Sequence, residues 1–359
     1  MSNTAATTNR RATVVGLGLI GGSLCVALRE RGWLVSGDDQ DPQRVTEALE
    51  RGLISAVGID AESQVTFVAV PVTAISLQVQ RALDATSGIV TDVGSVKAVV
   101  TRTITDPRFI GGHPMAGSEL EGLDGADGEL FTGAVWVLTP TPTTSDAAFA
   151  TVANIVNDLG AEVVGLDPVR HDELVAIVSH VPHLTAATLM GVAGSRATEH
   201  AALLRLAAGG FRDMTRIASG HPAIWLDICA ENRPAIISTL SALIDGLSDM
   251  RTAVDTGDRA TILQRLTAAR ESRANLPSRI KALADLSEVR IPIPDRPGAA
   301  AEVFTLAAEL GVNIPNFEVV HSVEGDRGIA VVLVETTSVE LFRGGLMARG
   351  FKPSVQRLD

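Results

Sequence analysis

The chain has 359 residues, of which 46% are hydrophobic and 20% are charged. This composition is typical of a folded globular protein with room for two or three domains, and it excludes a disordered chain. The net charge of −12 argues against a nucleic-acid-binding surface. An anionic ligand would therefore need a local group of cations.

The N-terminal residues, the longest apolar runs and the two cysteines indicate the cellular compartment. Residues 1–11 form a small polar tail without the apolar core of a secretory signal. No run reaches the ~18 uninterrupted apolar residues of a membrane span. Cys25 and Cys229 both lie in apolar, helix-like segments, which favours reduced core residues. We therefore expect a cytoplasmic protein with a flexible N-terminal tail.

A glycine-rich turn follows the first strand-like run. Residues 12–15 are apolar and β-prone, residues 16–21 read Gly-Leu-Gly-Leu-Ile-Gly, and a helical pattern follows. The next strand, 33–37, runs into Asp38 and Asp39, roughly 20 residues beyond the glycines, where a dinucleotide-binding fold places the acid that holds the ribose. Asp39 is the better partner, because strand alternation points the two side chains apart. A carboxylate there repels a 2′-phosphate and favours NAD over NADP; the alternative is a glycine turn without a nucleotide.

Strands and helices alternate up to residue 166. Strands are expected at 65–71, 88–93, 134–138 and 162–166, and helices from Pro42 and over 147–159. Repeated β–α units predict an α/β fold, a Rossmann-type doubly wound parallel sheet whose ligand lies at the carboxyl ends of the strands. Loops at 71–72, 94–97 and 111–119 follow such ends, so we expect them to converge near a nicotinamide. The predicted cofactor-binding residues are Gly16, Gly18, Leu19, Ile20, Gly21, Asp39, Val70 and Pro71.

A lone histidine stands in the last of these loops. His113 lies in Gly-Gly-His-Pro-Met-Ala-Gly-Ser-Glu, residues 111–119, just after the apolar pair 109–110. Glycines let other groups approach the backbone closely, and Pro114 fixes its own φ. Such a frame suits an imidazole that presents one ring nitrogen at a fixed place. The alternative is a turn whose histidine satisfies a local carbonyl.

From about residue 168 the pattern changes to an all-helical middle domain. Helices are expected at 171–179, 183–190, 196–208, 234–254 and 259–283, with breaks at 191–194, 209–210 and 220–222. Several of these segments are apolar around much of their circumference. Such helices bury more surface than one core needs, which indicates a second subunit and hence a homodimer.

His180 and His183 are three residues apart in this segment. Two histidines so spaced are one half of a metal site. However, no third ligand has metal-binding spacing, and Pro182 is expected to interrupt the helix that would align them. We therefore predict no metal.

A second motif in the helical segment is Gly-Gly-Phe-Arg-Asp-Met-Thr-Arg, residues 209–216. Its glycines are expected to open a helix that bears Arg212 and Arg216, with Trp225 further on. A helix N-terminus beside two guanidinium groups is a reasonable anion site. A solvated basic turn is the alternative.

The C-terminal segment follows the order βαββαβ. Strands are expected over 288–294, 316–322 and 328–335 and after 350, and helices over 299–310 and 339–349. This order predicts a small ferredoxin-like α+β module. The domains expected are thus 12–167 for the dinucleotide, 168–284 for substrate and dimerisation, and 287–359 as a separate module.

Together the motifs resemble the prephenate/arogenate dehydrogenase family, and the resemblance covers nearly the whole chain. Its most specific stretches are Gly-Leu-Ile-Gly-Gly-Ser-Leu at 18–24, Asp-Val-Gly-Ser-Val-Lys at 92–97 and the histidine motif at 111–119. Val-Ser-His-Val-Pro-His at 178–183 and the motif at 209–216 are nearly as telling. The tail resembles an ACT domain, a module that often binds amino acids, which implies tyrosine or a relative as effector.

The resemblance implies oxidative decarboxylation of prephenate with NAD+, a step of tyrosine synthesis. Hydride leaves ring C4, the C1 carboxylate leaves as CO2, and 4-hydroxyphenylpyruvate results. By resemblance, His113 accepts a hydrogen bond from the C4 hydroxyl, and Ser95 orients the histidine and the nicotinamide. The implied substrate-binding residues are Arg216 as carboxylate grip, His183, Glu119 as a gating acid, Trp225 as an aromatic wall, and Gly209. Contacts of Lys97, Arg212 and His180 with substrate stay open.

Three alternatives remain at this stage. An arogenate dehydrogenase would act on the same ring with an amino group on the side arm and form tyrosine directly. A β-hydroxyacid dehydrogenase would use a catalytic lysine on its helical domain, but none of Lys97, Lys281 and Lys352 has that context. A nucleotide-binding or amino-acid-binding sensor without turnover is the third.

Overall fold

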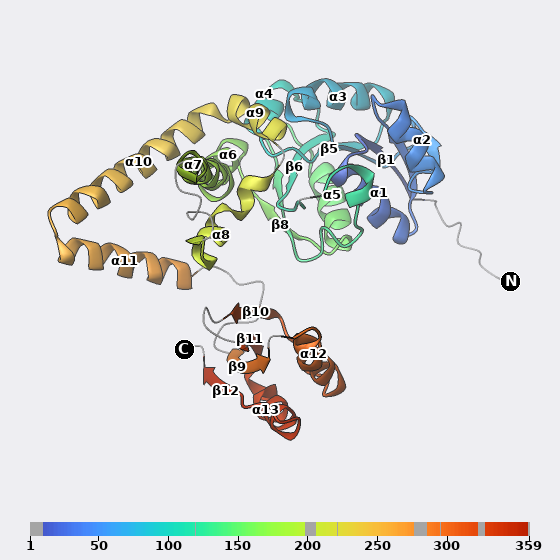
Figure 1. Cartoon of the computed structure of the whole chain (residues 1–359). Coiled ribbons are helices and arrows are strands. Elements are labelled where there is room, and N and C mark those ends of the chain that lie inside the picture. The colour runs from blue at the N-terminus through green and yellow to red at the C-terminus, as the bar shows by residue number, and fades with distance from the viewer. Residues whose placement is uncertain are drawn as a thin grey trace. The chain divides into compact units, whose positions relative to one another are not determined.

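The computed structural model describes residues 10–118, 120–197, 206–220, 222–275, 286–294, 296–321 and 327–357 (Figure 1). The chain forms two compact units, Met1–Thr256 and Gly257–Asp359. The first contains a large sheet and a group of helices. The second contains helix α11, Arg259–Ala274, and a small sheet.

Eight strands form one sheet in the order β3-β2-β1-β4-β5-β6-β7-β8. Their bounds are β1 Arg11–Val15, β2 Leu34–Asp38, β3 Ala56–Val57, β4 Val65–Val68, β5 Ile89–Asp92, β6 Phe109–Pro114, β7 Val135–Thr139 and β8 Glu162–Gly165. Neighbours from β3 to β6 run parallel, which confirms the Rossmann-type class. The sheet is not parallel throughout, because β7 pairs with β6 antiparallel and β8 follows β7. Among the described residues between β6 and β7, the one helix is the short 3-10 helix η1, Gly122–Gly125, whereas a parallel return needs a longer crossover.

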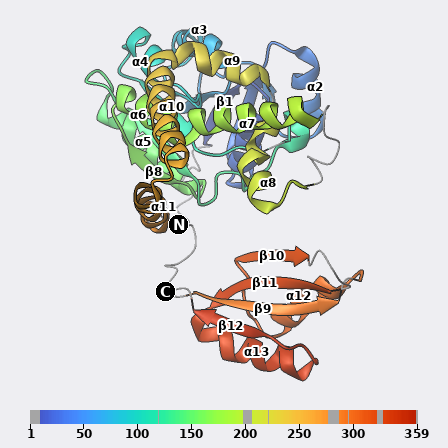
Figure 2. The same cartoon turned by 60° about the vertical axis from the view of Figure 1, so that its left-hand side comes forward.

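Helices cover both faces of this sheet (Figures 1 and 2). One face packs on α1 Leu19–Glu30, α2 Pro42–Glu50 and α5 Asp146–Asp158, and the other on α3 Val72–Ala85 and α4 Ala98–Thr103. Strand alternation divides the core between them: Val14 and Phe67 belong to the first face, and Val15 and Val68 to the second. Such double coverage explains why these strands are continuously apolar. The carboxyl ends of β1, β4, β5 and β6 lie at one edge.

The helical part opens with one continuous helix. It begins as α6, Pro168–Val175, continues as one π-turn, Ala176–His180, and ends as α7, Val181–Ala197. The predicted interruptions at Pro182 and at 191–194 were therefore wrong. Val181 N donates to Ala176 O, a wider turn than the α-helix makes, and such a turn accommodates a proline that lacks its own N–H. The two glycines of α7 weaken a helix by about 1 kcal/mol each without ending it.

The remaining helices of the first unit are α8 Gly209–Thr215, the 3-10 turn η4 Arg216–Ser219, α9 Pro222–Glu231 and α10 Arg233–Asp255. Gly209 does open a helix, as predicted, but that helix bears Arg212 only, since Arg216 begins the following 3-10 turn. The helix expected over 196–208 falls mostly outside the described residues, and 207–208 are not helical. The end of the helix expected over 259–283 also falls outside them.

Within the described residues, Pro168–Arg196 is the one helix with the length and mean hydropathy, 1.4, of a membrane span. It carries the polar side chains His171, Asp172, His180 and His183, all of them buried. Two of these bond to residues of α4 and α10, as described below. Only 33% of its apolar stretch is buried, and length and hydropathy alone are weak evidence for a membrane span.

The second unit holds a four-stranded antiparallel sheet in the order β10-β11-β9-β12. Its elements are β9 Leu286–Pro294, α12 Ala299–Glu309, β10 Asn316–His321, β11 Arg327–Glu335, the 3-10 turn Thr336–Ser338, α13 Val339–Ala348 and β12 Ser354–Arg357. The predicted βαββαβ order is confirmed. Both helices pack on the sheet through Val303, Leu306, Phe342 and Leu346, so the module has a core of its own.

Candidate active site

The turn after β1 is shaped by its glycines. Gly16 has a φ of +95°, and a Cβ built on it would lie 2.3 Å from Ala69 O. A Cβ on Gly21 would lie 1.8 Å from Gly16 O, which no side chain tolerates. Around Gly18, in contrast, a Cβ would meet nothing within 4 Å. The turn is thus closed against the protein and open outward, and it leads into the N-terminus of α1, where Leu19 and Ile20 begin the helix.

An acid stands against this turn. Asp39 Oδ2 accepts a hydrogen bond from Leu17 N at 2.7 Å, and its Oδ1 accepts from Asp41 N at 2.9 Å. The neighbouring Asp38 turns elsewhere and pairs with Arg81 at 2.5 Å. The two acids do point apart, and the carboxylate at the glycine turn is the one predicted. A dinucleotide fits here, because the open turn receives a pyrophosphate and the acid can hold a ribose.

The loop after β4 lines the same turn. Val70 Cγ1 would lie 3.0 Å from a Cβ on Gly16, and Pro71 is the residue that precedes α3. Val70 therefore lies beside the glycine turn, and Pro71 follows it in the same loop. Their contact with a cofactor stays a prediction.

His113 lies near the carboxyl end of β6 and is 7% exposed. A Cβ on Gly112 would lie 2.7 Å from Asp92 O, and one on Gly111 would lie 2.4 Å from Thr139 Oγ1. These two glycines let β6 press against β5 and β7, as the small residues of the motif indicated. His113 is consequently held at the same edge of the sheet as the glycine turn.

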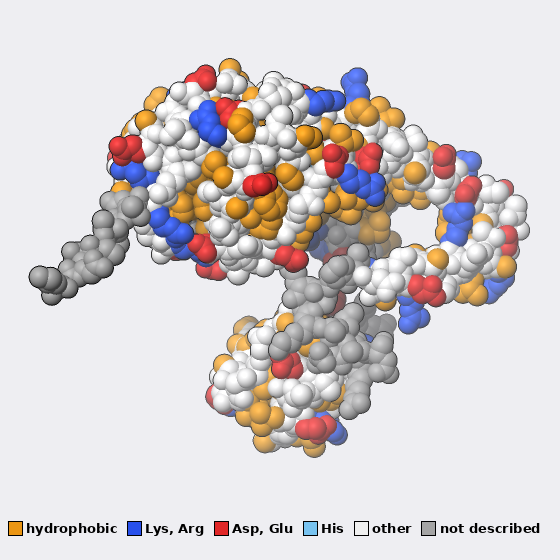
Figure 3. Space-filling model, turned by 180° about the vertical axis from the view of Figure 1, so that it is seen from behind, with side chains coloured by type: hydrophobic (Ala, Val, Ile, Leu, Met, Phe, Trp, Pro, Cys, Tyr) orange, Lys and Arg blue, Asp and Glu red, His pale blue; other side chains and the backbone are white. Residues whose placement is uncertain are grey.

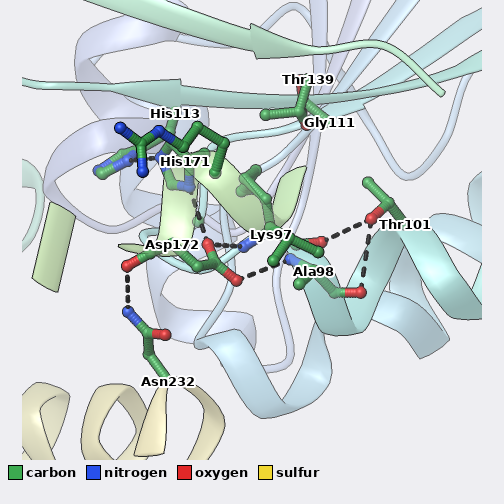
Figure 4. Close-up of polar contacts among 12 residues, drawn as sticks. Lys97, Ala98, Thr101, Gly111, His113, Thr139, His171, Asp172 and Asn232 are labelled. Atoms are coloured by element: carbon green, nitrogen blue, oxygen red, sulfur yellow. Dashed lines mark hydrogen bonds and ion pairs between the residues drawn. The ribbon is translucent and has the colours of Figure 1, made fainter. Parts of the chain in front are cut away.

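The ring of His113 contacts a second histidine that sequence reasoning did not find (Figure 4). His113 Nδ1 lies 2.8 Å from His171 Nε2, and His171 Nδ1 lies 2.8 Å from Asp172 Oδ1. Asp172 in turn accepts hydrogen bonds from Lys97 N at 2.8 Å and Ala98 N at 2.9 Å, the first backbone donors of α4. A residue of α6 therefore caps α4 and ends a line of three buried polar side chains.

A buried ion pair lies behind β6. Lys97 is fully buried, pairs with Asp92 and donates to Gly112 O at 2.8 Å. Asp92 also accepts from Gly94 N at 2.9 Å and Gly112 N at 3.2 Å. Lys97 is thus engaged inside the protein and holds the backbone next to His113. Ser95 belongs to the same loop and lies between Asp92 and Lys97 in the sequence.

Asn232, the residue that precedes α10, joins the start of that helix to this cluster. Its Nδ2 donates to Asp172 O at 2.8 Å and lies 3.1 Å from His180 Nδ1. Because the amide donates, His180 Nδ1 accepts and its Nε2 carries the hydrogen. That Nε2 is buried without a partner among the described residues.

His183 and Trp225 form the adjoining wall. Their rings stack with centroids 3.6 Å apart and an interplanar angle of 12°. His180 meets the same indole edge-on at 6.2 Å. Gly220 closes against both rings, since a Cβ there would lie 3.3 Å from His183 and 3.7 Å from Trp225. The structure therefore brings two predicted substrate residues into contact and connects them, through His180 and Asn232, with the cluster around His113.

The other predicted substrate residues are less enclosed. Arg216 is exposed at the start of η4, a turn that packs on α7. Arg212 is also exposed and donates from Nε to Ala207 O at 3.1 Å. Gly209 is exposed at the start of a helix too short for an anion site by itself. Glu119 lies outside the described residues, so its gating role stays a prediction.

Burial sets the protonation states of these groups. It lowers the pKa of His113 well below 6.5, and the charges of His171, Lys97 and His180 lower it further. It lowers the pKa of His180 to about 4, against a smaller raising effect of Asp172. The pKa of Lys97 is also lowered by burial, although Asp92 opposes this. His113 and His180 are therefore neutral at pH 7.

His171, Asp172 and Asn232 are the residues that sequence reasoning missed. Each is a single polar residue in a helical pattern, and an exposed helix face would look the same. A buried polar side chain needs a partner, but nothing in the pattern names that partner. No three His, Cys, Asp or Glu side chains of the described ranges could hold a metal ion.

A glycine turn with its acid and a buried imidazole lie at one edge of a Rossmann-type sheet. This arrangement defines an NAD-dependent dehydrogenase. The sequence matches the profile "Prephenate dehydrogenase, nucleotide-binding domain" over residues 24–165 and "Prephenate dehydrogenase, dimerization domain" over residues 167–268. It is also 32% identical to the prephenate dehydrogenase of Bacillus subtilis, over 88% of this chain and 90% of that protein. The chain belongs to the prephenate dehydrogenase family.

Solved structures agree with this assignment. An arogenate dehydrogenase from Synechocystis is similar at 30% identity and a TM-score of 0.64, covering 73% of this chain and 98% of that one. A prephenate dehydrogenase from A. aeolicus, solved with hydroxyphenyl propionate and NAD+, is similar at 26% identity and a TM-score of 0.70. That match covers 76% of this chain and all of the other. The family is therefore shown by sequence and by fold.

Proposed function

We propose that this protein oxidises and decarboxylates prephenate, forming 4-hydroxyphenylpyruvate and CO2 with NAD+ as the electron acceptor. The observation that supports this most directly is the buried, neutral His113, one ring nitrogen of which is engaged by His171 and the other left for a ligand. The A. aeolicus relative binds a hydroxyphenyl acid together with NAD+, which supports a cyclic, hydroxylated acid as substrate class.

The residues that would hold the cofactor are those of the glycine turn. Gly16 and Gly21 set the tight turn, and its open face at Gly18 would admit the pyrophosphate. The first N–H groups of α1 would meet its charge, and Asp39 would accept from the ribose hydroxyls. Bound there, NAD+ supplies the acceptor for the hydride that leaves ring C4. The carboxylate of Asp39 repels the 2′-phosphate of NADP.

His113 handles the proton of the C4 hydroxyl. Its neutral ring accepts that proton at Nε2 as the hydride leaves, so positive charge does not build up on the oxygen. When the C1–carboxylate bond breaks, its electron pair enters the ring and makes it aromatic, and the proton returns from His113 to the phenolic oxygen. No net proton is released. A group in this role typically contributes ~10²–10⁴-fold to the rate.

The carboxylates of the substrate need cations in an acidic protein. Arg216 is proposed to grip one of them, in a charge-assisted pair that a guanidinium can make with two hydrogen bonds. The stacked rings of His183 and Trp225 form a flat wall against which a six-membered ring can lie. Ser95 is proposed to orient His113 and the nicotinamide, Gly209 to lie on the substrate side, and Glu119 to gate binding.

The arogenate alternative has specific support, since an arogenate dehydrogenase is among the similar structures. Ring chemistry is the same for both substrates, and only the side arm differs. Purified protein with NAD+ and either prephenate or arogenate decides the matter when the absorbance of reduced cofactor is followed. Faster turnover of prephenate supports the proposal, and faster turnover of arogenate replaces it. No turnover of either would favour a sensor.

A homodimer is proposed as the working state. Residues 167–268 match a dimerization domain. Along α10, Ile237, Ile244, Leu247 and Val254 are each more than half exposed. Spacings of seven, three and seven place them on one side of the helix, as in a coiled-coil seam. Apolar side chains are also exposed elsewhere on the surface (Figure 3).

We propose further that the second unit binds tyrosine or a related amino acid and inhibits the enzyme. A cavity of about 280 Å³ lies between β9, β10 and the start of α12, with Arg296 at its edge. Its other lining residues are apolar or glycine, which suits an aromatic side chain, and Arg296 itself pairs with Glu302 at 2.6 Å. Titrating the full chain with tyrosine in a calorimeter, beside Arg296→Ala and the surface control Arg343→Ala, tests this. Absence of heat and of inhibition in the wild type would reject it.

A further inference from the structure

We propose that His171 and Asp172 are positioning residues that hold His113 in its Nδ1–H tautomer and so leave Nε2 as the proton acceptor. The inference rests on the proposed function only for the role of Nε2, which is to accept the proton of the C4 hydroxyl. The arrangement itself follows from the contacts of three buried side chains, which come from β6 and α6 (Figure 4).

Asp172 sets the direction of these hydrogen bonds, because a carboxylate can only accept. Its Oδ1 accepts from Lys97 N and faces His171 Nδ1 at 2.8 Å, so that nitrogen carries a hydrogen. Its Oδ2 accepts from Ala98 N, and its backbone carbonyl accepts from Asn232. Three hydrogen bonds besides the contact with His171 thus fix Asp172, which in turn holds His171.

The ring of His171 determines which nitrogen of His113 carries the hydrogen. A neutral imidazole has one N–H, and Nδ1 holds it, so Nε2 presents a lone pair. His113 Nδ1 lies 2.8 Å from that atom, and the two rings meet at 77° with centroids 5.0 Å apart. The hydrogen between them therefore belongs to His113 Nδ1. Nε2 of His113 therefore carries no hydrogen and can accept one. Among the described residues, the fully buried side-chain polar atoms that lack a partner are Thr66 Oγ1, Trp136 Nε1 and His180 Nε2, so His113 Nε2 is not one of them.

A second proton arrangement is conceivable and has the opposite consequence. If His171 were protonated, its Nε2–H would donate to His113, and the hydrogen of His113 would move to Nε2, which could then no longer accept. The buried charges oppose this state during catalysis. The carboxylates of Asp92 and Asp172 and the ammonium of Lys97 leave one net negative charge, with His180 neutral. One proton arriving on His113 brings the cluster to neutrality. If His171 already carried a proton, the cluster would be neutral beforehand, and the proton taken by His113 would make the total positive in a buried place.

The same contacts hold the imidazolium that forms when His113 takes the proton. Its Nδ1–H still donates to His171, which Asp172 keeps in place, so no side chain has to reorient as the proton moves. Groups that are oriented before the reaction lower its activation free energy, because no energy is spent on reorganising them when the charge develops. His171 and Asp172 need not touch the substrate for this effect.

The tautomer can be observed directly. Full-length protein carrying ¹⁵N-histidine gives two-bond ¹H–¹⁵N correlations that separate a protonated from a bare ring nitrogen, and the His113→Asn spectrum assigns the signal of His113. At pH 7 we expect a protonated Nδ1 and a bare Nε2. A protonated Nε2 on His113 would overturn the inference whether or not the protein turns over prephenate.

A pair of variants tests the consequence for the rate. His171→Met fills the space but cannot accept well, whereas His171→Gln places a carbonyl oxygen near the position of Nε2. We expect kcat to fall ~10–10²-fold in the first, with the KM for NAD+ unchanged, and to recover at least tenfold in the second, because His113 loses and regains its oriented acceptor. Equal losses in both, or wild-type kcat in a folded His171→Met, would remove the positioning role. If that variant does not fold, the wild-type spectrum decides.

Discussion

The glycine turn and the histidine cluster perform neighbouring tasks but are built in different ways. The turn, its helix and its acid come from residues 16–39, and its shape is set by backbone clearance at Gly16 and Gly21. The cluster joins β6 to α6, 58 residues further along the chain, and then to Asn232. Its shape is set by hydrogen bonds between buried side chains.

The difference teaches what a change to each region should do. A site made of local backbone tolerates the loss of one side chain, since the turn persists and only a contact is removed. A site made of buried polar partners does not, because each loss strands another group away from water. Changes in the cluster should therefore lower stability as well as rate, and changes at the turn should alter cofactor preference.

Lys97→Met should have the largest effect. It leaves the Asp92 carboxylate buried without its cation, which costs about 3–5 kcal/mol of the free energy of unfolding. Denaturant unfolding followed by tryptophan fluorescence measures this, since Trp33, Trp136 and Trp225 all lie in the first unit. Arg102→Met, an exposed change on α4, should stay within about 0.5 kcal/mol. Equal stability of both variants would show that the pair is dispensable.

Arg216→Ala tests whether the helical part holds the substrate. Loss of an ion pair to a carboxylate should raise the KM for prephenate by an amount equivalent to ~2–5 kcal/mol, with a smaller change in kcat. The matched comparison is Arg212→Ala, whose guanidinium already bonds to Ala207 O. A large rise in KM for the Arg212 variant alone would move the carboxylate site.

Asp39→Ala should act on cofactor choice. Without the carboxylate, NADP is no longer repelled, and the ratio of kcat/KM for NAD to that for NADP should fall roughly tenfold or more, the equivalent of one charged hydrogen bond. Asp39→Asn keeps an oxygen for Leu17 N and separates the charge from the anchoring of the turn. An unchanged ratio in both variants would assign the discrimination elsewhere.

Acid should lower the free energy of unfolding through the buried histidines of the cluster. The pKa of His180 is about 4 in the folded protein, and that of His113 is also far below 6.5. As pH falls below 6.5, the unfolded chain binds protons that the folded chain does not bind, so stability is lost between about pH 6.5 and about pH 4. Each buried histidine contributes a slope of at most about 1.4 kcal/mol per pH unit. Unfolding curves of wild type and His180→Asn over this range should show a shallower slope for the variant; parallel slopes would be inconsistent with a buried neutral His180.

The same contrast explains what could be predicted from the sequence. Local signals indicated the glycine turn, Asp39 rather than Asp38, the βαββαβ tail and the close packing around Gly111 and Gly112. Pro182 misled, because a π-turn carries the helix past it, and the antiparallel β7 had no signal in strand spacing. His171, Asp172 and Asn232 could not be found, since their role depends on which buried side chain meets them after α6 and α10 have packed.

The most direct test of the account is the kinetics of His113→Asn with prephenate, beside its affinity for NAD+. The account predicts that kcat falls at least ~10²-fold, because the acceptor for the C4 hydroxyl is lost, while the dissociation constant for NAD+ stays that of the wild type, because the glycine turn is untouched. A kcat equal to that of the wild type would contradict it.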